Sequence, residues 1–147
     1  MLPLKKILYP TDFSEASYEA LKVANELAVH FSAELWVVHA ISPLATATSP
    51  GGFSLVAEME KAAQTSLQEV IKERIPKEVH IRQSITIGGA ADEILRIAEQ
   101  ERVDLIVIGT HGQTGWRHAV FGSVAEKVVR LASCPVLSIR APHKQAE

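Results

Sequence analysis

The hydrophobic pattern along the chain alternates between two kinds of segment. Short apolar runs at strand spacing are separated by longer stretches whose apolar residues recur every three or four positions, which is typical of amphipathic helices. The predicted strands cover residues 4–9, 34–41, 78–87, 104–109 and 135–140, and the predicted helices cover residues 14–31, 55–74, 90–100 and 123–132. Regular alternation of strand and helix predicts an α/β fold, an open five-stranded parallel sheet with helices on both faces.

The strands differ in how many of their residues are apolar, and this predicts their order in the sheet. Residues 34–41 and 104–109 are almost continuously apolar, which favours interior strands. Apolar and polar residues alternate over residues 78–87, which favours an edge strand with one wet face. An order of 3-2-1-4-5 satisfies these preferences. The chain then reverses direction between strands 1 and 4, where ligands bind in open α/β sheets.

Length, charge and cysteine content limit the classes of protein to which the chain can belong. The 147 residues are the usual size of one domain, and we expect a single domain over residues 1–147. A net charge of −2 gives no basic excess for nucleic acid, and no apolar run approaches the ~20 residues of a membrane span. Only three residues separate the first two lysines from Pro10, too few for a signal peptide, so we expect a cytoplasmic protein. A single cysteine, Cys134, excludes an internal disulfide.

The segment GTHGQTGWRHAVFGS, residues 109–123, combines three glycines at three-residue spacing with a closing Gly-Ser pair. Successive backbone amides in such a loop make a concavity for anions, and the helix that begins at Ser123 adds free N–H groups and a favourable dipole. The sequence therefore predicts a phosphate site here. Two structural alternatives stay open: the glycines make only a turn, or Ser123 caps the helix in a capping box with Glu126.

Several catalytic and nucleotide motifs are absent. The loop has no lysine, so it is not a P-loop, and neither G-x-G-x-x-G after strand 1 nor G-x-S-x-G occurs. Arg117 and His118 are the nearby cations, and we interpret them as solvated loop residues. A site built mainly from amides holds phosphate but stabilises little of the charge that develops during phosphoryl transfer. We therefore predict no catalytic residue and no metal site of protein side chains alone.

A second segment, PTDFS, follows strand 1 at the same switch point. Asp12 there has two interpretations: a capping box with Glu15, for which Ser14 is a competing N-cap, or a contact with a nucleotide or its metal ion. Pro10 and Thr11 would form one wall of the cleft. His39, in the apolar second strand, is interpreted as a core residue.

These segments together resemble a known family. Gly109-x2-Gly112-x9-Gly122-Ser123 is similar to the G-x2-G-x9-G-[S/T] signature of the ATP-binding universal stress proteins. The segments KKILYPTDFS, VVHAI, Gly88-x-Ala90-x3-Ile94 and CPVLSI resemble that family in the same order along nearly the whole chain.

The resemblance implies a ligand, its contact residues and an assembly. It implies ATP with Mg²⁺ or Mn²⁺, the metal near Asp12 or Ser123, with ADP, AMP or cyclic AMP as alternatives. The implied contacts are Pro10, Thr11, Asp12, Ala40, Gly109, Thr110, His111, Gly112, Gln113, Thr114, Gly115, Gly122, Ser123 and Val124. It also implies a homodimer through the strand from Pro135 to Arg140, an apolar edge that pairing with a second copy would cover.

The expected function is that of an ATP-binding universal stress protein, a nucleotide-dependent switch or sensor in stress response. Three alternatives stay open: a slow ATPase or other nucleotide-processing enzyme, a cyclic AMP-binding module, and a ligand-free dimeric interaction protein.

Overall fold

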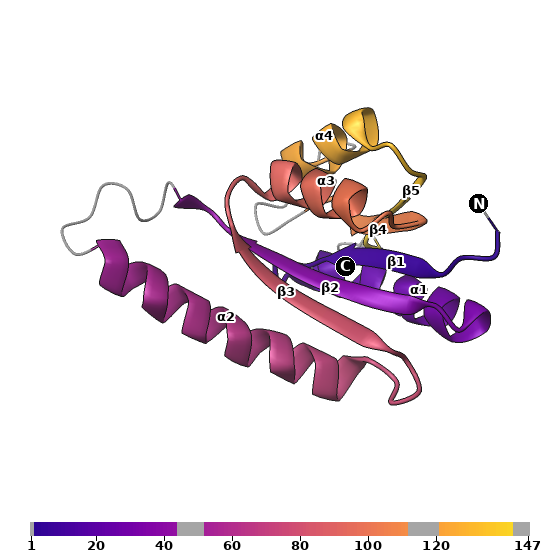
Figure 1. Ribbon diagram of the computed structural model, residues 1–147, viewed down its shortest axis with the longest axis horizontal. Coiled ribbons are helices and arrows are strands. Elements are labelled where there is room, and N and C mark those ends of the chain that lie inside the picture. The colour runs from indigo at the N-terminus through magenta and orange to yellow at the C-terminus, as the bar shows by residue number, and fades with distance from the viewer. Residues whose placement is uncertain (1, 44–51, 112–120, 143–147) are drawn as a thin grey trace, which may run out of the picture.

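The structure is a computed structural model that describes residues 2–43, 52–111 and 121–142. Strands and helices alternate throughout these ranges (Figure 1). The elements are β1 (Lys6–Pro10), α1 (Glu15–Phe31), β2 (Glu34–Ile41), α2 (Gly52–Arg74), β3 (Ile81–Ile87), α3 (Ala90–Gln100), β4 (Leu105–Gly109), α4 (Ser123–Leu131) and β5 (Val136–Ile139).

The five strands form one parallel sheet in the order β3-β2-β1-β4-β5, so the predicted fold class and strand order are confirmed. β1 lies in the centre, with Leu8 opposite Trp36 of β2 on one side and Ile106 of β4 on the other. The chain leaves β1 toward β2 and later returns to β4. The loops after β1 and β4 therefore depart from neighbouring strand ends, which leaves room for a cleft between them.

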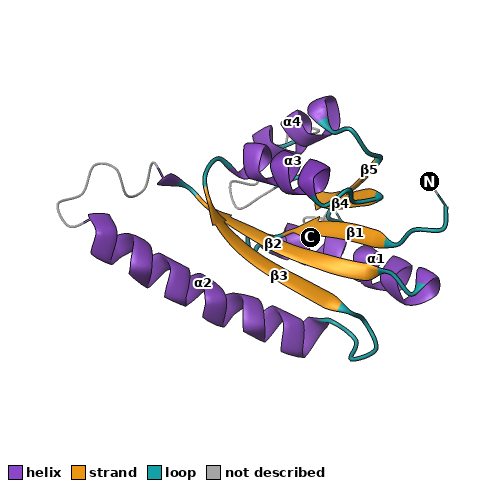
Figure 2. Cartoon of the chain, viewed as in Figure 1, coloured by secondary structure: helices purple, strands orange, loops and turns teal. Residues whose placement is uncertain are grey.

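Side-chain alternation along the central strands builds a core on each face of the sheet. Ile7 and Tyr9 point into the core formed with α1 and α2, whereas Leu8 between them points into the core formed with α3 and α4. Figure 2 shows the helices separated in this way. Two covered faces explain why the central strands are apolar at nearly every position.

Three predicted elements begin two or three residues away from where the structure has them, and other boundaries differ by a single residue. The third strand begins at Ile81 rather than at residue 78, because Val79 N–H donates to Pro76 C=O in a turn that precedes the strand. Helix α2 begins at Gly52, three residues earlier than the apolar stripe indicated. β1 begins at Lys6 and includes Pro10, which tolerates a strand end because it has no N–H to pair.

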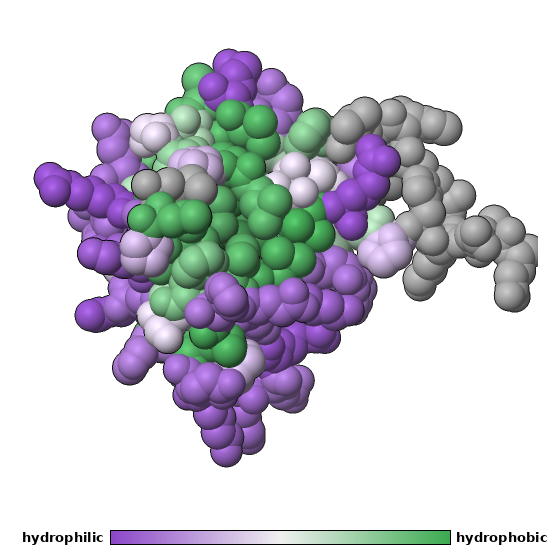
Figure 3. All heavy atoms as spheres, turned by 90° about the vertical axis from the view of Figure 1, so that its right-hand side faces the viewer, coloured by the Kyte–Doolittle hydropathy of each residue, from purple (hydrophilic) through white to green (hydrophobic). Residues whose placement is uncertain are grey.

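The two edges of the sheet are only partly covered. β3 is an edge strand, as predicted, but its half-buried and exposed residues do not alternate strictly, and Ile87 at its end is exposed. β5 pairs with β4 alone in the described sheet, and Leu137 on it is 38% exposed. Val129 and Leu131 of α4, the helix before β5, are also exposed. Figure 3 views the molecule from the right-hand side of Figure 1 and shows hydrophobic side chains gathered in the middle of that face.

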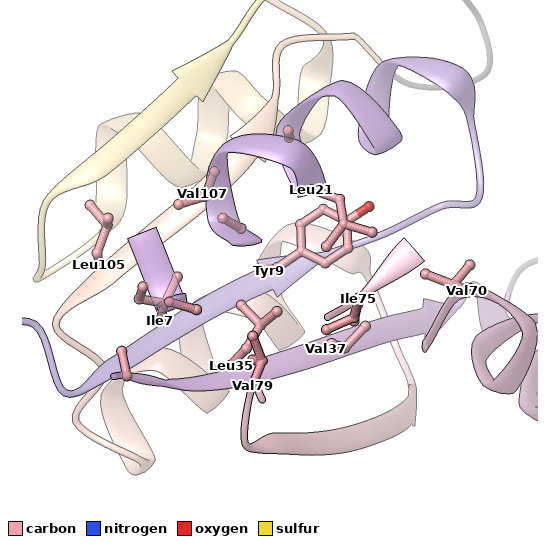
Figure 4. Packing of buried hydrophobic residues seen from close by; sticks show 14 of the residues in the cluster. Ile7, Tyr9, Leu21, Leu35, Val37, Val70, Ile75, Val79, Leu105 and Val107 are labelled. Atoms are coloured by element: carbon pink, nitrogen blue, oxygen red, sulfur yellow. The ribbon is translucent and has the colours of Figure 1, made fainter. Parts of the chain in front are cut away.

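Tyr9 is the largest fully buried side chain of the core and carries its one polar atom beneath α1. Its hydroxyl donates to the Ser17 carbonyl at 2.8 Å, and its ring lies beside Leu21 (Figure 4). Burial raises the pKa of Tyr9 to about 12, because the phenolate cannot be solvated there.

Replacing Tyr9 with phenylalanine should change how stability depends on alkaline pH. Between pH 10 and 12 the unfolded chain loses the Tyr9 proton while the folded chain keeps it. The unfolded state is thereby favoured, and the free energy of unfolding falls by about 1.4 kcal/mol per pH unit from this group. Tyr9→Phe lacks this loss, so urea unfolding should show the wild type losing about 2–3 kcal/mol more than the variant over that interval. Parallel pH profiles would contradict the burial of this hydroxyl.

Candidate functional site

A cleft of about 440 Å³ opens where the carboxyl ends of β1, β2 and β4 meet the first turns of α3 and α4. It lies at the reversal of strand order that the sequence predicted. Its lining consists of Pro10, Thr11, Asp12, Ser17, Val38, His39, Ala40, Ala90, Ile94, Ile108, Gly109, Thr110, His111, Gly122, Ser123, Val124 and Ala125.

The structure gathers every predicted site residue that it describes around this cleft. These are Pro10, Thr11, Asp12, Ala40, Gly109, Thr110, His111, Gly122, Ser123 and Val124. The other four, Gly112, Gln113, Thr114 and Gly115, lie outside the described residues, as do the loop cations Arg117 and His118.

Sequence reasoning missed the remaining lining residues. His39 was interpreted as a core residue, but it is half-buried in the cleft wall. Its position next to Ala40, at the carboxyl end of a strand beside the switch point, was the signal that could have identified it. Ser17 and Ala90 lie in the first turns of α1 and α3, which face the same edge of the sheet.

Several of the hydrogen bonds that hold the turn after β1 are made by Thr11, a buried residue. Its N–H donates to Val38 C=O at 2.8 Å, and its carbonyl accepts from His39 Nδ1 at 2.8 Å. Its hydroxyl accepts from Phe13 N–H and lies 3.0 Å from the Ser17 hydroxyl, which in turn donates to Ser14 C=O. The Thr11 backbone and hydroxyl are therefore occupied within the protein, and its role in the wall is to shape the turn.

The capping box proposed for Asp12 is wrong. The N-cap of α1 is Ser14, whose hydroxyl accepts from Ser17 N–H at 3.2 Å. Asp12 instead accepts from Ser14 N–H through Oδ1 at 3.0 Å, closing a tight turn ahead of the helix. The Asp12 carboxylate thus stands in the cleft wall at a fixed place, and it brings negative charge there.

The capping role proposed for Ser123 is also wrong. The N-cap of α4 is Gly122, which has no side chain, and Ser123 is the first residue of the helix. Glu126 N–H donates to Gly122 C=O, so the amides of Ser123, Val124 and Ala125 precede the first intrahelical donor. All three residues line the cleft. A glycine-capped helix start that faces a cleft is an arrangement that favours anions.

Gly109 has a packing role that the phosphate interpretation did not foresee. A Cβ at this position would lie 3.0 Å from the Ala16 carbonyl oxygen and 3.3 Å from its carbon, in the first turn of α1. The absence of a side chain therefore lets α1 approach β4 closely. The next residue, Thr110, donates to Ile139 C=O and accepts from Gly122 N–H, which brings the end of β4, the end of β5 and the start of α4 together.

The cleft has two chemically different parts. The apolar part consists of small or branched side chains from β2, α3 and β4: Val38, Ala40, Ala90, Ile94 and Ile108. The start of α4 presents amides and a hydroxyl in the other part. Among the described lining residues Asp12 is the acidic one and none is a lysine or arginine. The described residues also contain no group of three or more His, Cys, Asp or Glu side chains that could hold a metal ion.

Comparison with known proteins assigns the family. The universal stress protein family matches residues 3–140. The chain belongs to the universal stress protein family. The universal stress protein MJ0531 of Methanocaldococcus jannaschii is 39% identical over 144 residues, covering 96% of this chain and 85% of that protein. The resemblance seen in the sequence is thereby confirmed.

Solved structures agree with the family and the fold. The structure of the Methanocaldococcus jannaschii universal stress protein MJ0577 matches with a TM-score of 0.88 and 31% identity, covering 96% of this chain and 99% of that one. Two further universal stress protein structures, each 22% identical, are complexes: one with cAMP, and one from Archaeoglobus fulgidus with dAMP, with TM-scores of 0.62 and 0.63. No helix in the described part of this universal stress protein is both long and apolar enough to span a membrane.

Replacing Gly109 with alanine should destabilise the fold. The new Cβ would press on the Ala16 backbone, and relieving that contact requires α1 to shift, at a cost of about 1–3 kcal/mol. Gly89→Ala is the matched control, because its Cβ would meet only the Asp92 carboxylate at 3.2 Å, the end of an exposed side chain. Urea unfolding of both variants measures the difference in the free energy of unfolding. Equal stabilities would show that the close approach of α1 to β4 does not exclude a side chain at residue 109.

Proposed function

We propose that this universal stress protein binds an adenine nucleotide in the cleft, with ATP as the principal ligand. The observation that carries the proposal is the glycine-capped start of α4. It places Ser123 and Val124, whose amides precede the first intrahelical donor, in the lining of the same cleft as the apolar side chains, and the Ser123 hydroxyl does not cap the helix. An anionic group and a flat apolar group on one ligand match these two parts, and a nucleotide carries both.

The two parts of the cleft suggest where the two ends of the nucleotide would bind. The adenine and ribose would lie along Pro10, Asp12 and Ala40, with the base meeting the Ala40 backbone. The phosphates would lie at Gly122, Ser123 and Val124, with residues 109–115 wrapping the ribose and phosphates between them. Family members solved with cAMP and dAMP support an adenine mononucleotide unit as the common ligand element.

A divalent cation would accompany a triphosphate. No lysine or arginine lines the described cleft, and the Asp12 carboxylate adds negative charge to the same site. Mg²⁺ or Mn²⁺ between the phosphates and the oxygens of Asp12 or Ser123 would offset that charge. The metal would supply charge neutralisation there.

The role we propose is a nucleotide-dependent switch or sensor in the cytoplasmic stress response. Slow hydrolysis is the rival function. The described lining offers no arginine or lysine to stabilise a transferring phosphoryl group. This favours a protein that binds the nucleotide over one that hydrolyses it. Steady-state assays with Mg²⁺ separate the two, because several turnovers per minute would require an enzyme.

We further propose a homodimer in which β5 pairs antiparallel with β5 of a second copy. The outer edge of β5 has no partner strand in the described sheet, Leu137 on β5 is exposed, and so are Val129 and Leu131 on the preceding helix α4. Pairing would satisfy the backbone groups and cover these side chains.

Two substitutions at the start of α4 test the nucleotide proposal. Ser123→Ala should weaken ATP·Mg²⁺ binding roughly tenfold or more, because a hydroxyl bond to a charged phosphate is lost. Gly122→Val should abolish binding by filling the phosphate position, while the fold survives because φ of −69° at Gly122 suits any residue. Isothermal titration measures both, with Ser66→Ala on α2 as the control. Unchanged ATP affinity in both variants would show that the phosphates do not bind at the start of α4.

A charge at the β5 edge tests the dimer. Leu137→Asp should convert the protein to a monomer, because the carboxylate would be buried between two copies without a partner. Ile87→Asp, at a comparably exposed hydrophobic residue on the opposite edge strand, is the matched control and should stay dimeric. Light scattering after size-exclusion chromatography gives the mass. A dimer that survives Leu137→Asp, or is lost in Ile87→Asp alone, would refute the β5 interface.

A further inference from the structure

His39 links two segments of the cleft wall that are far apart in the sequence. It lies in β2, one residue before Ala40, and its ring reaches the turn after β1. Nδ1 is 2.8 Å from the Thr11 carbonyl oxygen. A carbonyl oxygen can only accept, so Nδ1 carries the proton, and this bond fixes the tautomer of the ring.

The other partner of the ring is Phe13, two residues along the same turn. The centroids of the two rings are 4.5 Å apart, with an interplanar angle of 36°. Phe13 has φ of 63°, a left-handed conformation that is unfavourable for a bulky residue. Such a backbone persists only where surrounding contacts hold it, and those contacts here include the Thr11 hydroxyl, the His39 ring and the hydrophobic core against which Phe13 packs.

Asp12 lies between the two residues that His39 contacts. Its place in the wall therefore depends on how firmly Thr11 and Phe13 are held against β2. A turn that is ordered before the ligand arrives does not lose conformational entropy on binding, which raises affinity without any added contact.

We propose that His39 is a positioning residue that pre-orders the 10–13 turn for the adenosine half of the ligand. It acts through its hydrogen bond to the Thr11 carbonyl. The inference rests on the proposed nucleotide function and deepens it by assigning the effect to the nucleoside part of the ligand. The consequence is specific: loss of this bond weakens the binding of adenosine and AMP by the same factor and that of ATP·Mg²⁺ by at least that factor, whereas Ser123→Ala weakens only the binding of the two phosphate-bearing ligands.

The test uses two variants of nearly equal shape. His39→Leu and His39→Asn both remove the ring from Phe13, but only asparagine has an amide N–H at the position of Nδ1. His39→Leu should bind all three ligands about five- to tenfold more weakly, as expected for one lost hydrogen bond to a buried acceptor. His39→Asn should recover most of that loss. Isothermal titration gives the affinities, and thermal melts give the fraction folded at the titration temperature.

The outcomes separate this inference from the proposed function. A wild-type protein that binds none of the three ligands refutes the nucleotide proposal itself. If the wild type binds, the positioning role is overturned by wild-type affinity in His39→Leu, by equal affinities in the two variants, or by a loss confined to AMP and ATP.

A measurement on the wild type alone guards against a variant that fails to fold. Phe13 N–H donates to the Thr11 hydroxyl and Ser14 N–H donates to Asp12 Oδ1, so both amides report the order of the turn. Hydrogen exchange of the ligand-free protein should find them already protected, with little further slowing when adenosine is added. Amides that exchange freely until adenosine is present would overturn pre-ordering.

Discussion

The constraint on which the structure depends is the position of β1 between β2 and β4 in a parallel sheet. Parallel pairing sends the chain out of all three strands at the same edge, while the reversal of order at β1 sends the following segments to opposite faces. The turn into α1 and the loop toward α4 therefore separate, and a cleft is left between them. Burial of both faces by helices holds the three strands in this arrangement, with Ile7 and Tyr9 on one side and Leu8 on the other.

Within that cleft the polar groups fall into two kinds. Those of the β1 turn are engaged with one another: the Thr11 hydroxyl with Ser17 and Phe13, and the Thr11 carbonyl with His39. Those at the start of α4 face the cleft without an N-cap side chain, because Gly122 has none. On one wall the Thr11 groups are thus hydrogen-bonded within the protein, whereas the other wall offers donors. A ligand with a nucleoside at one end and phosphates at the other fits this division of roles.

Much of this arrangement could be predicted from the sequence. Periodicity gave the elements, because buried strands and amphipathic helices differ in their spacing of apolar residues, and the switch point followed from the order. Which residue caps a helix could not be predicted at Asp12 or Ser123. Neighbouring residues could each serve as the N-cap there, and the residue that does so is determined by where the chain enters the helix. The packing role of Gly109 and the hydrogen bond from His39 to Thr11 could not be predicted either. Both join residues from different strands and helices, and only the folded chain brings these elements together.

The central claim is that phosphate binds the first turn of α4 while the nucleoside binds beside β1 and β2. Amide chemical shifts of the isotopically labelled protein during titration with ATP·Mg²⁺ test it most directly. The account predicts saturable shifts of the Ser123, Val124 and Ala125 amides together with Ala40, and adenosine alone should shift Ala40 but leave the three helix amides nearly unchanged. Saturable shifts confined to residues outside the cleft, or no shifts at millimolar nucleotide, would contradict it.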